Sequence, residues 1–316
     1  MKLSRPFMQL PVLFDIARLQ AEVEALPAEA WTHHPDRLAG NSASRLISAQ
    51  GQETDAVQGQ MRATRWLAAM PYTRQVLAGF GVVWSRSRLM RLAPGAIVPE
   101  HADVNYHWHT RVRLHIPIFT RPEVLFHCDG QTVNMAEGEA WIFDNWRRHH
   151  VENRSIQDRV HLVADTTGTA AFWRFANEQA APRAQWQTVD WDPQMSPQLL
   201  TETNQRSAIM PAAEVQMLLE DLKQELTVAG PNSGVEARLA QFGILLEDFV
   251  RDWRQLCALH GNSGQGRADF LHLANALYNG ANPLTVGLVM RTNNIAAQLV
   301  LEQRVLEHLV ADIAPI

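Results

Sequence analysis

Residues 101–165 read HADVNYHWHTRVRLHIPIFTRPEVLFHCDGQTVNMAEGEAWIFDNWRRHHVENRSIQDRVHLVAD. Short runs of alternating hydrophobic and polar residues follow one another here, separated by turn residues and without helical spacing. Asp129-Gly130, between two such runs, is a strong β-hairpin signal. Together with the run that begins near Gly81, the pattern gives about eight short strands without intervening helices, as in an antiparallel sandwich or barrel. We therefore predict an all-β core.

Within this block, His101 and Asp103 stand two positions apart, so in an extended chain both side chains leave the same side and can reach one metal ion. A third ligand must come from another strand, and either His149 or His150 can supply it. Neighbouring strand residues face opposite sides, so only one of these two points inward. Two imidazoles and a carboxylate on one face of a metal leave the other face open, which is the arrangement in non-heme Fe(II) oxygenases.

Arg159 follows His149 by ten residues and shares one strand face with His161 and Val163. Its planar guanidinium can hold a carboxylate with two hydrogen bonds. Iron that activates O2 needs an electron-donating co-substrate, and 2-oxoglutarate is a dicarboxylate. We therefore expect Fe(II), 2-oxoglutarate and O2 as cofactor and co-substrates, with Arg159 on the far carboxylate of 2-oxoglutarate.

Arg113, His115 and Pro117 form one face of an earlier predicted strand. An inward-facing arginine and histidine are costly to bury unless something anionic satisfies them. We therefore assign Arg113 and His115 to the co-substrate pocket as well. His127 has no partner at metal-ligand spacing and is left out of the predicted site.

Four motifs in this block carry a family resemblance: R-x-H-x-P at Arg113–Pro117, G-E-x-W-x-F-D at Gly138–Asp144, H-x-V-x-N at His149–Asn153 and R-x-H-L-V-x-D at Arg159–Asp165. The joint pattern resembles the aspartyl/asparaginyl β-hydroxylase family. The resemblance covers about 65 to 85 residues of the 316.

The resemblance implies a double-stranded β-helix core (jelly roll, cupin-like) and hydroxylation of an unactivated C–H bond in an amino-acid side chain, free or within a peptide or protein. In the family, the histidine that opens H-x-V-x-N is the metal ligand, which selects His149 over His150. Arg159 and Arg113 would hold 2-oxoglutarate, with His115 alongside. Asp103 makes the sequence more similar to bacterial members that hydroxylate free proline.

Helical spacing of hydrophobic residues predicts an N-terminal helix at residues 13–26 and another at 55–69, both packed outside the sheet. Residues 27–53 are polar and rich in turn formers, so we expect an irregular loop between them. With the strand block, these elements make residues 1–170 an oxygenase domain of the α+β class.

Beyond this domain, prolines and glutamines in residues 171–205 suggest a connecting segment over the barrel surface. Helical periodicity returns in residues 206–316, which we expect to form an all-helical domain. The last of its four helices should begin near Pro283, because proline suits a first helical turn. The helical domain could cap the site or form a homodimer, and the sequence leaves both open.

The composition is that of a soluble globular protein, with 46% hydrophobic and 19% charged residues. A net charge of -5 gives no sign of a nucleic-acid surface, and no hydrophobic run is long enough for a membrane span. Cys128 and Cys257 are too few for a disulfide framework. The N-terminus lacks the uninterrupted hydrophobic region of a signal peptide. We therefore expect a cytoplasmic protein whose partner is a small molecule or a peptide.

Two other functions remain open. A cupin-like metal-dependent isomerase or hydrolase would keep the three ligands but would have no use for Arg159. A non-catalytic binding protein would use the helical domain to recruit a partner. The residues themselves do not distinguish proline from asparagine, aspartate or a lipid-linked acyl group as the substrate.

Overall fold

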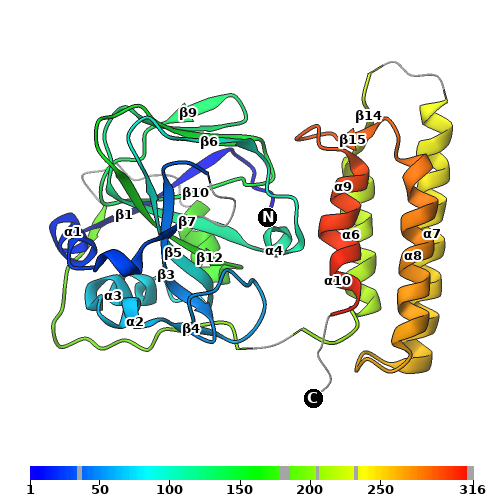
Figure 1. Cartoon of the computed structure of the whole chain (residues 1–316), viewed down its shortest axis with the longest axis horizontal. Coiled ribbons are helices and arrows are strands. Elements are labelled where there is room, and N and C mark those ends of the chain that lie inside the picture. Colours follow the sequence, from blue (N-terminus) through cyan, green and yellow to red (C-terminus); the bar gives the residue numbers. More distant parts are fainter. Residues whose placement is uncertain (34–37, 178–185, 204–205, 231–233, 312–316) are drawn as a thin grey trace. The chain divides into compact units, whose positions relative to one another are not determined.

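The computed structural model describes residues 1–33, 38–177, 186–203, 206–230 and 234–311. The chain divides into a β-rich unit, residues 1–102 and 110–205, and a helical unit, residues 103–109 and 206–316. Figure 1 shows the strands and helices of both units. A short segment that follows His101 therefore groups with the C-terminal helices.

The larger sheet of the β-rich unit contains β1 (Phe7–Phe14), β2 (Thr32–His33), β3 (Asn41–Ala49), β4 (Met61–Ala63), β5 (Trp84–Leu92), β7 (Val112–Phe119), β10 (Glu139–Phe143), β12 (Arg159–Thr166) and β13 (Gln187–Val189). Its order is β13-β1-β10-β7-β12-β5-β3-β2, with β4 paired to β3. Neighbouring strands run antiparallel except β13, which is parallel to β1.

The smaller sheet contains β6 (Ile97–His101), β8 (Val124–Cys128), β9 (Gln131–Val133) and β11 (His149–Asn153), in the order β6-β11-β8-β9. Strands β8 and β9 form the predicted hairpin, whose turn places Asp129 and Gly130 at φ 49° and 74°. Such left-handed conformations suit these two residue types. Phe7 of the larger sheet packs edge-on against Phe126 of the smaller one. Two sheets packed face to face confirm the predicted double-stranded β-helix core.

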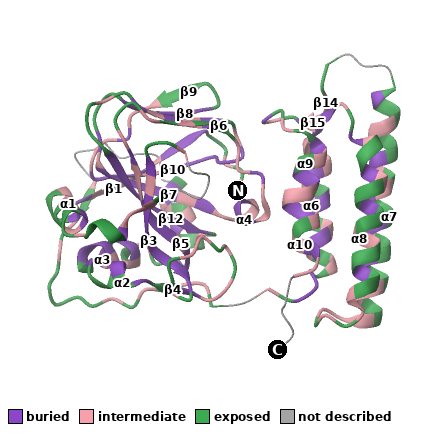
Figure 2. Ribbon diagram, in the orientation of Figure 1, coloured by how far each residue is buried: buried purple, intermediate pink, exposed green. Residues whose placement is uncertain are grey.

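The strands of the larger sheet separate hydrophobic from polar side chains by alternation. One face of β7 and β12 packs against helices, and it carries Val112, Leu114, Ile116, Ile118, Val160, Leu162 and Ala164. The opposite face carries Arg113, His115, Arg159, His161 and Asp165. Figure 2 shows that buried residues concentrate in these strands. The polar face is therefore held inside the barrel by a rigid hydrophobic layer behind it.

Helices α1 (Ile16–Glu24), α2 (Arg65–Ala68) and α3 (Pro71–Gly79) cover the hydrophobic face of the larger sheet. The helix predicted at 13–26 is shorter, because β1 continues to Phe14 and the Asp15 side chain caps α1 by accepting from the Arg18 backbone N–H at 3.2 Å.

Two predictions for the N-terminal region are wrong. The expected loop at 27–53 contains the 3₁₀ turn Ala28–Ala30, β2 and β3, and the expected helix at 55–69 contains β4 and the short α2. Strand β3 escaped detection because Ser44 and Ser48 are buried in it, so its polar residues give no amphipathic alternation.

The segment expected to connect the two domains packs on the β-rich unit. It contains most of α5 (Ala170–Asn177) and all of β13, and Thr201 bridges to Trp84 at the end of β5. Glu202 accepts two hydrogen bonds from the Arg111 guanidinium, each 2.9 Å long. These contacts make residues 186–203 part of the barrel structure.

The helical unit contains α6 (Ala212–Glu225), α7 (Val235–His260), α8 (Arg267–Leu284), α9 (Ala297–Leu301), a π-helical turn at Glu302–Leu306 and α10 (Glu307–Leu309). A small ladder joins β14 (Leu226–Val228) to β15 (Leu288–Met290). Trp253 of α7 packs against Phe270 of α8 with ring centroids 4.8 Å apart. Pro283 lies inside α8, near its end, and does not begin the next helix as predicted.

Residues 103–109 form an irregular turn and the start of α4 (Tyr106–Thr110), so the extended chain that was expected to carry both His101 and Asp103 ends at His101. Buried Arg304, in the π-helical turn, donates from Nε to the Val104 carbonyl at 3.1 Å and from Nη1 to Asp221 at 2.8 Å. Tyr106 donates to the Glu214 carboxylate. The segment is thus tied to the helical unit by side chains of α6 and of the π-helical turn.

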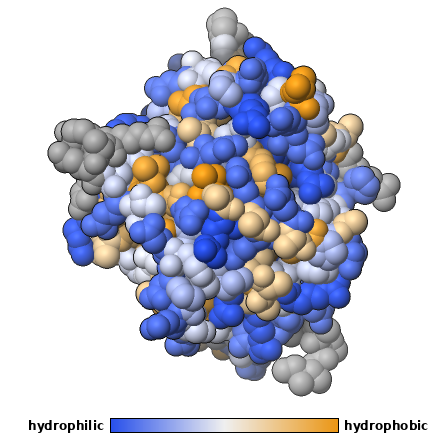
Figure 3. Space-filling model, turned by 90° about the vertical axis from the view of Figure 1, so that its left-hand side faces the viewer, coloured by the Kyte–Doolittle hydropathy of each residue, from blue (hydrophilic) through white to orange (hydrophobic). Residues whose placement is uncertain are grey.

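No helix among the described residues combines the length and the hydrophobicity that a membrane crossing requires. On the face that Figure 3 shows, hydrophobic residues lie in small groups among hydrophilic ones.

Candidate metal centre

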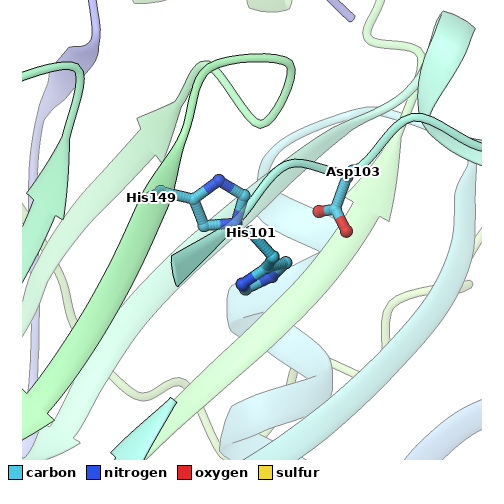
Figure 4. A group of neighbouring side chains, drawn as sticks. All are labelled: His101, Asp103 and His149. Atoms are coloured by element: carbon cyan, nitrogen blue, oxygen red, sulfur yellow. The ribbon is translucent and has the colours of Figure 1, made fainter. Parts of the chain in front are cut away.

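Three predicted ligands converge at one edge of the smaller sheet. His101 ends β6, Asp103 follows two residues later, and His149 begins β11 as the direct partner of His101 in the sheet. Ligand atoms of the three residues all lie within 4.8 Å of one another. The two imidazole centroids are 4.2 Å apart, and Figure 4 shows the three side chains pointing toward one another. The arrangement can hold one metal ion.

Backbone carbonyls orient both imidazoles. Nδ1 of His149 lies 2.9 Å from the Arg147 carbonyl, and Nδ1 of His101 lies 2.8 Å from the Pro99 carbonyl. A carbonyl accepts only, so each Nδ1 carries a proton, and in the neutral form of each ring the lone pair lies on Nε2, where a metal can bind it. Metal binding through Nε2 is therefore compatible with both carbonyl contacts.

The structure places His149 beside His101, whereas His150 faces the other side of the same sheet. The His150 ring stacks on that of His127 with centroids 4.1 Å apart. Strand alternation explains the difference, because adjacent residues of β11 point to opposite faces.

Arg159 is a buried cation at the start of β12. Its Nη2 donates to Nδ1 of His161 at 2.8 Å, while its Nε has no hydrogen-bond partner and no described carboxylate pairs with it. Burial lowers the pKa of Arg159 to about 9. A guanidinium without a counter-charge is costly inside a protein, so this position favours an anionic ligand.

His161, the hydrogen-bond partner of Arg159, contacts His115, and the centroids of the two imidazole rings are 5.8 Å apart. Both are buried, and burial holds the pKa of each well below the usual histidine range. Both ring nitrogens of His115 and Nε2 of His161 lack hydrogen-bond partners. These neutral rings offer polar atoms that only a bound molecule or water can satisfy.

Aromatic side chains connect the ligand triad to this polar interior. Phe143 of β10 contacts His149 with centroids 4.8 Å apart and His115 with centroids 5.4 Å apart. Phe126 of β8 packs on Phe143 at 4.7 Å. Ring contacts therefore link His149 through Phe143 to His115, whose ring contacts that of His161, the partner of Arg159. Sequence reasoning missed both phenylalanines, since hydrophobicity alone does not separate a site wall from ordinary core.

Arg113 has a carboxylate partner. Its Nε and Nη2 donate to the two oxygens of Asp165 at 2.8 and 3.1 Å, and Arg86 lies 3.5 Å from the same carboxylate. Arg113 and Asp165 are direct cross-strand partners on β7 and β12. A role for Arg113 on 2-oxoglutarate stays a prediction. Sequence reasoning missed this ion pair. Both residues lie within the four motifs, but the register that pairs β7 with β12 could not be read from the sequence.

The residues fit ferrous iron and a 2-oxo diacid. Two neutral imidazoles and a carboxylate suit Fe(II) and leave coordination positions open. The unpaired buried guanidinium supplies the cation that a second, distant carboxylate needs.

A search of curated proteins gives no match to this chain. Among solved structures, an oxidoreductase of the 2OG-Fe(II) oxygenase family from Burkholderia pseudomallei is 17% identical, covering 53% of this chain and 82% of the other at a TM-score of 0.35. A Cupin 2 conserved barrel domain protein from Salinispora arenicola is 16% identical, covering 49% and 94% at a TM-score of 0.27. The model of the aspartyl/asparaginyl beta-hydroxylase family matches residues 20–168. This match includes the four motifs between Arg113 and Asp165 on which the predicted resemblance rests.

Proposed function

We propose that this protein is an Fe(II)- and 2-oxoglutarate-dependent dioxygenase that hydroxylates an unactivated C–H bond of an amino-acid side chain, free or within a peptide. The match of residues 20–168 to a hydroxylase family supports this class of reaction. The observation that carries the proposal is the combination of a convergent His-Asp-His group with a buried arginine that no carboxylate of the described residues pairs with.

His101, Asp103 and His149 would hold the iron. When bound, ferrous iron and the 2-oxo acid together supply oxygen activation, with succinate and carbon dioxide as co-products. The protein contributes the tautomers of the two imidazoles, which their carbonyl partners fix before any metal arrives. The single carboxylate of Asp103 partly offsets the charge of the metal.

Arg159 would hold the distal carboxylate of 2-oxoglutarate. Its Nη2 is oriented by His161, and its unpartnered Nε is available to the ligand. His115, neutral and without partners, can donate one further hydrogen bond to a carboxylate oxygen. In such a dry environment each charge-assisted hydrogen bond contributes more than it would in water.

Phe126 and Phe143 would exclude water from the region between the metal and Arg159. Both are buried, and they pack on one another and around His115. Exclusion of water strengthens electrostatic contacts and limits side reactions at the metal.

The test is anaerobic titration of the metal-free protein, first with Fe(II) and then with 2-oxoglutarate, followed by a succinate-release screen over amino acids and short peptides. We expect wild type to bind both, and Arg159→Met to bind Fe(II) normally but 2-oxoglutarate about 100-fold more weakly, because two charge-assisted hydrogen bonds of roughly 1.5 kcal/mol each are lost. Arg121→Met, a change at an exposed arginine, is the control.

Two outcomes would reject the proposal. If the protein bound Fe(II) but not 2-oxoglutarate, and Arg159→Met left its activity intact, a cupin-like isomerase or hydrolase that uses the same three ligands would become the better explanation. If the protein bound neither Fe(II) nor 2-oxoglutarate, a non-catalytic binding role would be favoured.

A further inference from the structure

A second group of metal-ligand side chains lies on the outer face of the smaller sheet. His127 comes from β8, and His150 and Glu152 come from β11. One ligand atom from each lies within 4.8 Å of the other two. All three residues are half-buried. Because His149 and His150 are neighbours on β11, this group is on the opposite side of the strand from the candidate ligand His149.

The sheet itself sets the spacing of this group. His127 and His150 are direct partners in the antiparallel β8–β11 pair. Their rings are nearly parallel, at an interplanar angle of 8° and a centroid distance of 4.1 Å. Glu152 is two residues beyond His150 and therefore shares its face. The backbone thus brings two imidazoles and a carboxylate together without help from a flexible loop.

His127 is held with one nitrogen available. Its Nδ1 lies 2.8 Å from Oγ1 of Thr132 on β9, and its Nε2 is shielded from solvent without a hydrogen-bond partner. If Thr132 accepts from Nδ1–H, the lone pair resides on Nε2, facing the group. A hydrogen bond to the remote nitrogen is the usual support of a metal-bound histidine.

Glu152 divides its two oxygens between two partners. Oε2 accepts from Nε of Arg154 at 2.5 Å, whereas Oε1 lies 3.5 Å from Nε2 of His150. The arginine therefore orients the carboxylate by one oxygen and leaves the other directed at the histidines. A metal ion at this group can take Oε1 while the ion pair with Arg154 persists.

We propose that His127, His150 and Glu152 form a second metal site, outside the barrel, that binds a late divalent transition metal such as Zn²⁺. Two nitrogens and one oxygen suit Ni²⁺, Cu²⁺ and Zn²⁺, which bind such ligands more tightly than Fe²⁺ does. Donor atoms on one tetrahedral zinc ion are about 3.4 Å apart, so the ligand atoms must approach by roughly 1 Å. Because an imidazole lone pair lies in the ring plane, one of the two stacked rings must also tilt before both nitrogens meet at the ion, and water takes the remaining position.

A metal ion at this site would link β8 to β11, the strand that also carries His149. A metal that binds the folded chain but not the unfolded chain stabilises the fold by mass action. Zinc should therefore raise the melting temperature even when His101 and Asp103 are replaced. The inference does not rest on the proposed oxygenase function, since it concerns the opposite face of the sheet.

The test uses the full chain carrying His101→Ala and Asp103→Ala, which removes two inner ligands. Calorimetric titration with Zn²⁺ should show one saturable site per chain, and Cu²⁺ bound to the same protein should show nitrogen coordination by electron paramagnetic resonance. Adding His127→Gln or His150→Gln should weaken zinc binding at least about 10-fold, a loss of roughly 1.4 kcal/mol. Thr132→Val should weaken it by about 10-fold through the lost support of His127.

His272→Gln, at an exposed histidine of α8, is the matched control and should leave the affinity for zinc unchanged. The second site is refuted if the doubly substituted background binds no zinc, or if His127→Gln and His272→Gln bind it equally well. If instead the centre at His101, Asp103 and His149 does not bind metal, the wild-type chain should bind a single zinc ion, and His150→Gln should abolish that binding. Circular dichroism of each variant confirms that the comparison is made between folded proteins.

Discussion

Arg159 donates from Nη2 to Nδ1 of His161 at 2.8 Å, and this neutral ring is the one described side chain that accepts a hydrogen bond from the buried guanidinium. Because His161 accepts at Nδ1, its proton resides on Nε2. The pair therefore presents several donors and no acceptor to the barrel interior, which is the polarity that a bound carboxylate requires.

Replacing Arg159 should separate ligand affinity from stability. Arg159→Met removes a charge that burial penalises, so we expect the free energy of unfolding of the ligand-free protein to stay equal or to rise by about 1 kcal/mol. Added 2-oxoglutarate, with a redox-inert metal, should raise the melting temperature of wild type but not of the variant. Denaturation with and without 2-oxoglutarate measures both effects. A large loss of stability in the ligand-free variant would show that Arg159 has a structural role.

Asp103→Ala should weaken Fe(II) or Co²⁺ binding by about 100-fold or more, because it removes the only anionic donor of the inner group. It should also abolish turnover of 2-oxoglutarate in the absence of substrate. Asp158→Ala, at an exposed aspartate, is the control. Full activity in Asp103→Ala would remove this residue from the proposed ligand set.

Lowering the pH should destabilise the metal-free protein through His115 and His161. Burial lowers the pKa of both below the ordinary value of 6.5, so the unfolded chain binds protons that the folded chain does not. The free energy of unfolding should therefore fall as the pH drops below 6.5, by up to about 1.4 kcal/mol per pH unit for each histidine. Urea unfolding at a series of pH values measures this slope. His161→Asn should flatten it, whereas His272→Gln should not.

Asp165→Asn should destabilise the fold by about 3–5 kcal/mol, because it leaves the Arg113 and Arg86 guanidiniums near a buried, uncharged side chain. The carboxylate of Asp165 is 1% exposed, so water cannot replace it. A double-mutant cycle with Arg113→Met, followed by chemical denaturation, gives the coupling energy. Additive effects of the two substitutions would mean that the ion pair contributes nothing of its own.

Arg304→Met should loosen residues 103–109. The arginine is buried and binds both the Val104 carbonyl and Asp221, so its loss leaves those acceptors without their cationic donor. Hydrogen exchange should accelerate in the segment 103–109 and in the neighbouring turn of α6. Arg251→Met, on the exposed face of α7, should leave the exchange of the segment unchanged.

The sequence predicted those features that depend only on residues close together in the chain. The alternation of β7 and β12, the Asp129-Gly130 turn and the spacing of His101 and Asp103 are all of this kind. Strand β3 was missed because the serines Ser44 and Ser48 stand in its buried positions, where a hydrophobic pattern would have been expected.

Contacts set by strand register were outside the reach of the sequence. His127 had no partner at ligand spacing, yet it lies directly opposite His150 once β8 pairs with β11. Arg113 and Asp165 likewise stand 52 residues apart and meet only because β7 and β12 are neighbours. Such pairs require knowledge of which strands adjoin and by what offset, and a one-residue slip would turn each side chain to the other face.

The grouping of residues 103–109 with the C-terminal helices bears on how this gene could be shortened. A protein ending at residue 205 would keep every strand of the barrel but would lose Arg304, Asp221 and Glu214, which hold Val104 and Tyr106. The peptide immediately after His101 would then be released from its anchors, with Asp103 on it. A fragment that keeps residues 103–109 anchored must therefore extend through the helical unit to the π-helical turn that contains Arg304.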